Sequence, residues 1–389
     1  MYKIATLNKI SPVGLNRFGE DYTLVDDAAE ADAIVVRSQN MHDMKFGSGL
    51  RAIARAGAGV NNIPLQRCAE EGIVVFNAPG ANANAVKELV LAGLLLASRN
   101  IPEALTWTKT LKKDVGPAVE AGKKQFAGHE LKGKTLGVIG LGAIGVMVAN
   151  LCLSLDMNVV GYDPYLDLRH AHALSGKIPV INDLQNMLPK CDFITIHVPM
   201  NDSTRGMIDE RRFGQMKKGA VFLNFARDGL VNEKALVEAL DEGHLGKYVT
   251  DFPTDAIINH RNVIHTPHLG ASTTEAEENC AIMAAEEIID FFEHGNIENS
   301  VNFPACDLGV IHPDAAARLC IMNKNVPTIL SQFTQILSDR QINIRDLTNK
   351  SRKEFAYNIL DVDKDIPDDL LAKINEIDGV IKAWTIKNK

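Results

Sequence analysis

The stretch Thr135–Gly145, TLGVIGLGAIG, decides the fold of this chain. It opens with the short apolar run of a buried strand, and the segment AIGVMVANLCLSL that follows is apolar at helical spacing. Where the two meet stand Gly140, Gly142 and Gly145, in the pattern GxGxxG. The first glycine permits a tight turn, the second lets the backbone approach a pyrophosphate, and the third lets the helix pack closely on the strand. The stretch therefore predicts a phosphate-binding turn at a helix N-terminus.

A doubly wound sheet is predicted by the spacing of the strand-like segments around this turn. Each is a short run rich in apolar residues, and helix-like segments separate them. The predicted strands are Thr135–Ile139, Asn158–Asp163, Phe193–His197, Ala220–Phe225, Lys247–Asp251 and Val263–His265. Strands that alternate with helices build a parallel sheet, so we expect a Rossmann-like α/β domain.

A second α/β unit precedes the glycine turn, because short apolar runs alternate with longer mixed segments from Lys3 to Phe76. A nucleotide-binding sheet that begins near residue 130 makes this first unit a separate domain. We expect a substrate-binding domain at 1–93, completed by a return helix at 275–300, and a nucleotide-binding domain at 94–274.

The C-terminal part is predicted to be an independent module at 315–389, reached through a linker at 301–314 with prolines and little periodicity. Strand-like runs and helices from Pro327 to about Arg340 and from Asp368 to Ile377 give the order βαββαβ. This is the order of ferredoxin-like folds. A module of this size is only marginally stable alone, so we expect it to pair with a second copy through its sheet.

Composition excludes several classes of partner. The formal net charge is −8, and the Lys and Arg residues are scattered, so neither nucleic acid nor a membrane is an expected partner. The longest apolar run, Leu89–Ala97, falls well short of the roughly 20 residues of a membrane-spanning helix. No export signal is visible, and the six cysteines form neither a CxxC pair nor a cluster with histidines. We expect a cytoplasmic protein with reduced cysteines and no metal site.

An acidic residue at the end of the second predicted strand indicates which dinucleotide binds. Asp163 lies 18 residues beyond Gly145, where a carboxylate can accept hydrogen bonds from both ribose hydroxyls. It would repel a 2′-phosphate, so NAD is favoured over NADP. The alternative is that Asp163 merely begins the turn DPY. His197 follows another strand at the same edge of the sheet, and we interpret it as structural rather than catalytic.

Three polar residues follow later strands at the edge that would face a nicotinamide. Arg227 comes after AVFLNFA, Asp255 after YVTDF, and His268 after NVIHT. Arg227 can grip a carboxylate with paired donors, and His268 can exchange a proton with a substrate hydroxyl. Asp255 would hold the imidazole and fix its tautomer. Singly, each is equally well explained as a surface Arg, a loop cap or a turn His.

At this point the chain resembles the D-isomer-specific 2-hydroxyacid dehydrogenase family over essentially its whole length. The strings that carry the resemblance are RAGAGVNNI (55–63), VFNAPGANANAVKEL (75–89), GLGAIG (140–145), HVPMNDSTRGMI (197–208), NFARDGLVNEKAL (224–236) and TPHLGAST (266–273). The resemblance implies the roles given above for Arg227, Asp255 and His268. With the glycine motif it gives an NAD site made of Gly140, Gly142, Ala143, Ile144, Gly145, Asp163, Pro164, His197, Val198, Pro199, Thr204, Phe225, Ala226, Arg227, Asp251, His268, Gly270 and Ala271.

The substrate expectation is based on the likeness to the branch of the family that oxidises D-3-phosphoglycerate to 3-phosphohydroxypyruvate, the first step of L-serine biosynthesis. A dianionic phosphate and a carboxylate need two cationic anchors. Arg227 with His268 would hold one end, and the other would meet Arg37, Ser38, Arg55, Gly57 and Asn77. The alternative is that Arg37 and Arg55 pair with acids at the domain surface.

The C-terminal module resembles an ACT domain, which in relatives binds an amino acid between paired modules. Asn325 and Asn343 match positions that bind L-serine in similar feedback-inhibited enzymes, although they could equally cap a helix and close a turn. Two departures matter. Asp255 stands where the family usually has Glu, in a segment that looks one residue shorter, and Thr328 replaces the usual glycine after proline.

The leading hypothesis is thus an NAD-dependent phosphoglycerate dehydrogenase. A second is a reductase of another short 2-oxo acid, such as hydroxypyruvate, glyoxylate or 2-oxoglutarate. A third is a non-catalytic NAD-sensing binding protein, against which the complete set of Arg, acid and His argues. We expect a homodimer made by crossing helices near Asn84 to Thr110, or a homotetramer through the modules.

Overall fold

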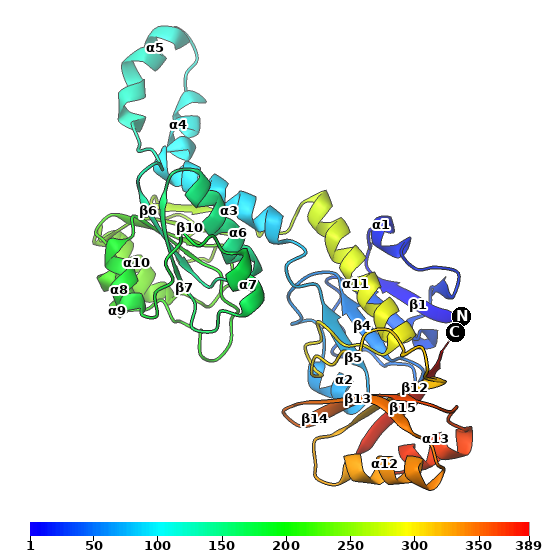
Figure 1. Cartoon of the computed structure of the whole chain (residues 1–389). Coiled ribbons are helices and arrows are strands. Elements are labelled where there is room, and N and C mark those ends of the chain that lie inside the picture. Colours follow the sequence, from blue (N-terminus) through cyan, green and yellow to red (C-terminus); the bar gives the residue numbers. More distant parts are fainter. Residues whose placement is uncertain (389) are drawn as a thin grey trace. The chain divides into compact units, whose positions relative to one another are not determined.

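The structure is a computed structural model that describes residues 1–388 (Figure 1). It divides into two units, which are treated separately here. Unit 1 consists of Met1–Ala81 with Glu277–Lys389, and unit 2 is Asn82–Ala276.

Unit 2 contains a parallel sheet with the strand order β11-β10-β9-β8-β6-β7. The strands are β6 (Thr135–Ile139), β7 (Asn158–Tyr162), β8 (Phe193–Ile196), β9 (Ala220–Asn224), β10 (Leu245–Thr250) and β11 (Val263–His265). The short helices along this part of the chain are α7 (Leu168–Ala173), α8 (Leu184–Met187), η3 (Leu188–Lys190), α9 (Glu210–Gln215) and α10 (Glu233–Asp241). The predicted doubly wound parallel sheet is confirmed.

The strand order reverses beside β6, which pairs with β7 on one side and β8 on the other. Open α/β sheets bind ligands at this switch point, outside the carboxyl ends of the strands. Helix α6 (Ala143–Ser154) starts there, directly after the glycine turn. On its outer side, β7 forms an isolated parallel bridge, which joins Gly161 to Val180. The glycine turn thus lies where the topology favours a ligand.

Helix α3 (Ala83–Ser98) marks a difference from the expected domain boundary at residue 94. Its buried residues Val86, Val90 and Leu94 belong to the core of unit 2, together with residues of α6 and β6. Because the whole helix packs on this sheet, the chain enters unit 2 at Asn82. Periodicity predicts the helix from the sequence, but it does not indicate on which domain the apolar face packs.

Helices α4 (Ile101–Thr108) and α5 (Val115–Gly122), followed by η2 (Lys123–Phe126), lie away from the sheet of unit 2 (Figure 1). Neither α4 nor α5 has a fully buried residue, and the apolar side chains of Leu105 and Val115 are about half exposed. Within residues 1–388, no single helix is long and apolar enough to cross a membrane. Helices α3 and α4 together have the required length and composition, but the chain bends by 67° between them.

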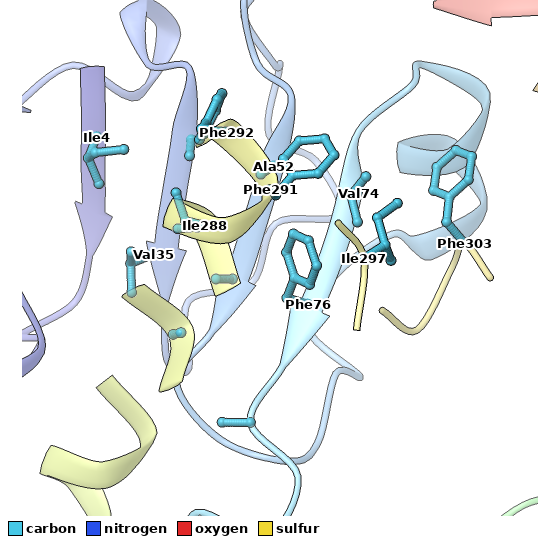
Figure 2. Packing of buried hydrophobic residues seen from close by; sticks show 14 of the residues in the cluster. Ile4, Val35, Ala52, Val74, Phe76, Ile288, Phe291, Phe292, Ile297 and Phe303 are labelled. Atoms are coloured by element: carbon cyan, nitrogen blue, oxygen red, sulfur yellow. The ribbon is translucent and has the colours of Figure 1, made fainter. Parts of the chain in front are cut away.

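Unit 1 begins with a parallel sheet in the order β2-β1-β3-β4-β5. Its elements are β1 (Tyr2–Leu7), α1 (Pro12–Leu15), β2 (Tyr22–Val25), η1 (Ala28–Glu30), β3 (Ala33–Val36), β4 (Ala52–Arg55), α2 (Leu65–Glu70) and β5 (Val74–Asn77). Helix α11 (Thr274–His294) packs on this sheet, as Figure 2 shows for Ile288, Phe291 and Phe292. The expected return helix is therefore part of this domain.

The C-terminal module has the predicted order βαββαβ. It consists of β12 (Ala317–Lys324), α12 (Ile329–Asp339), β13 (Ile344–Arg352), β14 (Phe355–Val362), α13 (Asp368–Asn375) and β15 (Val380–Lys387). The strands pair in the antiparallel order β13-β14-β12-β15, the ferredoxin-like arrangement, and α12 and α13 lie on one face (Figure 1).

The other face of this sheet packs on the first sheet's core, so the module shares a hydrophobic core with the rest of unit 1. The ring of Trp384 meets the edge of Phe291 at 5.5 Å and stacks on Tyr357 at 6.0 Å. The Tyr357 hydroxyl donates a hydrogen bond of 2.7 Å to the carbonyl of Gly295, just after α11. The module is therefore packed against the domain that precedes it, where an independent module was expected.

A buried arginine joins the module to the end of α11. Arg318 and Asp361 lie opposite each other on β12 and β14, and the guanidinium contacts both carboxylate oxygens, at 2.6 and 2.9 Å. Its Nη1 also donates to the carbonyls of His294 and Gly309, at 2.6 and 2.7 Å. The arginine is completely buried. Removal of this buried charge would leave its acceptors without a donor and would strongly destabilise the fold.

Glu287, on α11, gives unit 1 a specific pH dependence. Burial raises the pKa of this carboxyl to about 8. Oε1 accepts a hydrogen bond of 2.8 Å from Asn299, and Oε2 has no partner within residues 1–388. Since the folded chain holds the proton more tightly than the unfolded chain, stability falls as the pH rises from about 4.5 to about 8.

We expect Glu287→Gln to remove this dependence, because glutamine is neutral at every pH and keeps the acceptor for Asn299. At pH 9 the variant should be more stable than the parent chain by on the order of 3 kcal/mol, with little difference at pH 5. Thermal unfolding at both pH values measures this. An equal difference at the two pH values would contradict the assignment of the buried proton.

Candidate active site

The glycine turn after β6 has the backbone geometry that the motif requires. Gly140 has φ +91°, in the left-handed region that favours glycine. A Cβ on Gly145 would lie 1.9 Å from the carbonyl oxygen of Gly140, so only glycine lets α6 approach the turn this closely. A Cβ on Gly142 would meet nothing within 4 Å. The turn thus combines close helix packing with open access to the N-terminus of α6, which starts with Ala143 and Ile144.

Asp163 follows β7, and its carboxylate organises two backbone segments. One oxygen accepts a hydrogen bond of 2.8 Å from the amide of Leu141, inside the glycine turn. The other accepts one of 2.8 Å from the amide of Tyr165, which closes the turn DPY. The structure shows the alternative interpretation, in which Asp163 begins the turn DPY, and it also places the carboxylate beside the glycine turn.

A pocket of about 430 Å³ lies beside the glycine turn, within unit 2. Its volume is in the range of about 300–1,000 Å³ that is usual for ligand sites. The predicted residues that line it are Gly140, Gly142, Asp163, Pro164, His197, Val198, Pro199 and Thr204. Further lining residues were not predicted, although they lie in the glycine turn, at the end of β7 or in the segments after β7 and β8: Leu141, Tyr162, Tyr165, Leu166, Asp167, His170, Asn201, Ser203 and Met207.

Two predicted cofactor residues, Phe225 and Ala226, are buried beneath the sheet edge. A Cβ on Gly93 of α3 would lie 3.0 Å from the Phe225 ring, so this ring packs tightly on the helix. Thr204 donates a hydrogen bond of 2.6 Å to the carbonyl of Pro199 and so holds the loop after β8. These residues shape the edge of the sheet that carries the pocket.

His197 is held neutral. Burial lowers the pKa of its imidazole to about 3. Nε2 lies 3.0 Å from the Thr195 hydroxyl, and Nδ1 has no partner within residues 1–388. An imidazole with so low a pKa is neutral near neutral pH and is a weak proton acceptor there.

Arg227 lies just beyond β9, at the same edge of the sheet. Asn224, the last residue of β9, donates a hydrogen bond of 3.0 Å to the Arg227 carbonyl, and the arginine Nη1 donates one of 2.6 Å to the carbonyl of Ala226. Burial lowers the pKa of the guanidinium. No carboxylate pairs with Arg227 within residues 1–388, so its remaining donors are available to an anion.

Asp251 holds the loop that carries His268. This buried residue follows β10, and its carboxylate accepts three hydrogen bonds: from the Thr266 hydroxyl at 2.6 Å and from the amides of Leu269 and Gly270, both at 2.7 Å. The donors stand on both sides of His268 in the sequence. Asp251 and Gly270 were expected to contact the cofactor. The structure shows a further role for them, because the Asp251 carboxylate fixes the loop, in part through the amide of Gly270.

His268 is exposed and has φ +56°, an unusual value for a residue other than glycine. Its amide donates to the Asp251 carbonyl at 3.1 Å, and its ring meets the edge of Phe252 at 5.0 Å. The ring nitrogens form no hydrogen bond within residues 1–388. Strained backbone that is held in place by its surroundings is common at functional sites, and the imidazole is available to a substrate.

The structure does not bring Asp255 to His268. The Asp255 side chain is exposed and makes no hydrogen bond or ion pair with the part of the chain that the structure describes. The preceding residue, Thr254, instead donates to a carboxylate oxygen of Glu233 on α10. The shorter segment DFPTD, noted above as a departure from the resemblance, carries this acid.

The predicted phosphate-binding residues all belong to unit 1. The Nε of Arg55 donates to the Arg37 carbonyl at 3.1 Å, and a Cβ on Gly57 would lie 1.8 Å from an Arg55 nitrogen, so the glycine makes room for this guanidinium. Arg37 forms an ion pair of 2.7 Å with Glu277, as the alternative interpretation held for this residue. The side-chain Nδ2 of Asn77 donates a hydrogen bond of 2.7 Å to the carbonyl of Ala58.

Ser38 lies in the same region, and its amide donates at 2.9 Å to the side chain of Asn8. Within residues 1–388, no three His, Cys, Asp or Glu side chains are placed to hold a metal ion.

Comparison with known proteins places this geometry in a family. Residues 91–270 match the family described as D-isomer specific 2-hydroxyacid dehydrogenase, NAD binding domain. The D-3-phosphoglycerate dehydrogenase of Haemophilus influenzae is 34% identical over 341 residues, which cover 84% of this chain and 78% of that protein. The chain belongs to the D-isomer specific 2-hydroxyacid dehydrogenase family.

Other proteins similar to this chain are also named D-3-phosphoglycerate dehydrogenase. The D-3-phosphoglycerate dehydrogenase of Methanocaldococcus jannaschii is 40% identical over 290 residues, which cover 72% of this chain and 53% of that protein. The chain thus spans about half the length of this relative. A solved structure of NAD+-bound 3-phosphoglycerate dehydrogenase from Entamoeba histolytica has a TM-score of 0.61 and 26% identity, and the match covers 77% of this chain and 98% of that one.

The pocket of this family member fits NAD. The open space beside Gly142 admits a pyrophosphate to the N-terminus of α6, and Asp163 presents a carboxylate next to the glycine turn. A carboxylate at this position suits the free ribose hydroxyls of NAD and disfavours a 2′-phosphate.

The expected effector residues form local contacts in turns of the C-terminal module. Asn325 donates a side-chain hydrogen bond of 3.1 Å to the carbonyl of Lys353, and the amide of Asn343 donates at 2.8 Å to the Asp363 carboxylate. Thr328 has φ +76°, which is strained for a β-branched residue, whereas the glycine expected there from the resemblance would adopt it without strain.

Proposed function

We propose that this dehydrogenase oxidises D-3-phosphoglycerate to 3-phosphohydroxypyruvate with NAD, the first step of L-serine biosynthesis. The observation that supports the proposal is that three predicted functional segments lie at the carboxyl edge of the unit 2 sheet. The glycine turn follows β6, Arg227 follows β9, and the loop with His268 is tied to Asp251 after β10. The relatives named D-3-phosphoglycerate dehydrogenase support the choice of substrate.

The residues of unit 2 divide the chemistry between them. Arg227 binds the substrate carboxylate through paired N–H donors. His268 accepts the proton of the C2 hydroxyl through a ring nitrogen during oxidation and returns it during reduction. Bound NAD supplies the hydride acceptor. Asp255 is proposed, from the family resemblance, as the acid that orients His268, and this role requires its loop to turn toward the imidazole.

Arg55 is proposed as the main anchor of the substrate phosphate, with Ser38, Gly57 and Asn77 beside it. Arg37 contributes less, because Glu277 already neutralises it. Phosphate recognition by arginine depends on charge and on paired donors, so the anchor discriminates phosphorylated from unphosphorylated acids.

The test is Arg55→Ala, assayed with 3-phosphohydroxypyruvate and with hydroxypyruvate. Loss of a charge-assisted contact should lower kcat/KM for the phosphorylated acid by about 10- to 100-fold. The value for hydroxypyruvate should change little. Arg17→Ala is the matched control, since Arg17 pairs with Glu286 on the surface of the same unit. Equal losses for both substrates would count against the phosphate site, and activity on the unphosphorylated acid alone would favour another 2-oxo acid.

The module is proposed to be an ACT domain that binds L-serine between paired copies near Asn325 and Asn343. Its ferredoxin-like sheet order supports this assignment. Thr328 has a larger side chain than the glycine expected at this position, so it would leave less room for an effector beside it. Asn325 and Asn343 would have to bind the effector while they keep their local hydrogen bonds, or exchange them. Steady-state assays with and without L-serine test the proposal.

We also propose a cytoplasmic homodimer, or a homotetramer through the modules. The half-exposed apolar side chains of Leu105 and Val115 on α4 and α5 support association through these helices. All six cysteines are buried and unpaired in the part of the chain that the structure describes, as is usual in a reducing compartment.

A further inference from the structure

A second cavity of unit 2, here called the basal cavity, lies at the amino ends of the strands. It has a volume of about 350 Å³. Lys134 precedes β6, Asp192 precedes β8, Lys217 and Lys218 precede β9, and Lys247 lies at the start of β10. The glycine turn follows the carboxyl end of β6, and no residue lines both cavities. The basal cavity is therefore separate from the proposed NAD site.

The charge of the basal cavity is opposite to that of the chain. Its wall has four lysines, and within residues 1–388 two carboxylates pair with them: Asp192 with Lys217 at 2.5 Å, and Glu103 with Lys247 at 2.6 Å. Four positive charges against two negative ones leave an excess of two. The whole chain has a formal net charge of −8, so this positive excess is local.

The carboxylate of Asp192 already accepts hydrogen bonds from other residues of unit 2. Burial tends to raise the pKa of this carboxyl, but hydrogen bonds from Lys217 and from the Thr135 amide, together with the charges of Lys217 and Lys134, hold the pKa below its usual value. The carboxylate therefore stays ionised and satisfied. It lowers the repulsion between the lysines without filling the cavity.

Lys134 and Lys218 carry the remaining charge. Their ammonium groups form no hydrogen bond or ion pair within the described residues 1–388, although they line the same cavity as Lys217. Each ammonium group has three N–H donors. A concave wall of one sign concentrates ions of the opposite sign, and lysine binds phosphate as a point charge.

We propose that the basal cavity binds a small phosphorylated metabolite, with Lys134 and Lys218 as its main contacts and Lys217 beside them. A ligand with two or more negative charges matches the excess of two positive ones. The volume of the cavity is within the range of about 300–1,000 Å³ typical of small-molecule sites. The site does not depend on the proposed dehydrogenase reaction, because none of its residues takes part in it.

Calorimetric titration with inorganic pyrophosphate tests the site. The full chain is first saturated with NADH, so that pyrophosphate cannot enter the pocket at the glycine turn. We expect saturable binding that Lys134→Gln with Lys218→Gln weakens by about 30-fold. The matched control is Lys177→Gln with Lys234→Gln, at two exposed lysines elsewhere on unit 2, and it should bind within about twofold of the parent chain.

Three results would overturn the proposal: no binding to the NADH-loaded chain, equal binding by the parent and the cavity variant, or equal weakening in the control. Lys218→Glu alone, in an exposed turn, is the second variant in case the double variant unfolds, and it should abolish binding. Both variants should keep the parent rate of NADH oxidation, because these lysines lie outside the proposed catalytic site.

Discussion

Replacement of His268 by glutamine should lower kcat by about 10²- to 10⁴-fold, the usual contribution of a positioned general base. Glutamine keeps a polar side chain of similar size but cannot accept the hydroxyl proton. The Asp251 carboxylate holds the loop through Thr266, Leu269 and Gly270 rather than through the imidazole, so the backbone should stay in place. Steady-state oxidation of NADH measures the loss.

The matched control is His265→Gln, three residues earlier, at the exposed end of β11. Within residues 1–388, this side chain forms a hydrogen bond only with the carbonyl of Ile258, so the control should keep nearly full activity. NADH binding, followed by fluorescence, should be the same in both variants and the parent. If His268→Gln kept the parent kcat, another group would have to be the base.

Replacement of Arg318 by methionine should destabilise unit 1 by about 3–5 kcal/mol, because it leaves the buried Asp361 carboxylate without its cation. The carbonyls of His294 and Gly309 lose a donor at the same time. Since the module and the first sheet share one hydrophobic core, the midpoint of thermal unfolding should fall for the whole unit.

The companion variant is Arg318→Met with Asp361→Leu, which replaces the ion pair with apolar side chains. It should recover part of the lost stability, because no buried charge remains unpaired. An unchanged unfolding midpoint in the single variant would contradict the packing of the module on α11.

Much of the fold could be predicted because it depends on local patterns. The glycine motif specifies the turn, and the β-branched runs specify the strands of unit 2. The shared core of unit 1 could not be predicted. Strands β12 and β14 are buried on both faces, one under α12 and α13 and the other on the core of the first sheet, and no local pattern indicates which domain covers the second face. The same holds for α3, whose apolar face is visible in the sequence but whose partner, the sheet of unit 2, is not.

The candidate site shows the same limit at single residues. The spacing after strands pointed to Arg227 and His268, which the structure places beyond β9 and β11. The three contacts of Asp251 were not predictable, because their donors lie 15 to 19 residues away along the chain. The basal cavity combines lysines from segments more than a hundred residues apart, and no local pattern indicates that they meet.

The most direct test of the central proposal is the steady-state oxidation of NADH by the parent chain with 3-phosphohydroxypyruvate, beside unphosphorylated hydroxypyruvate. The roles proposed for Arg227 with the carboxylate and for Arg55 with the phosphate predict turnover of both acids, with kcat/KM higher for the phosphorylated one by about tenfold or more. Equal values for the two acids would contradict the substrate, and no turnover of either would contradict the enzyme.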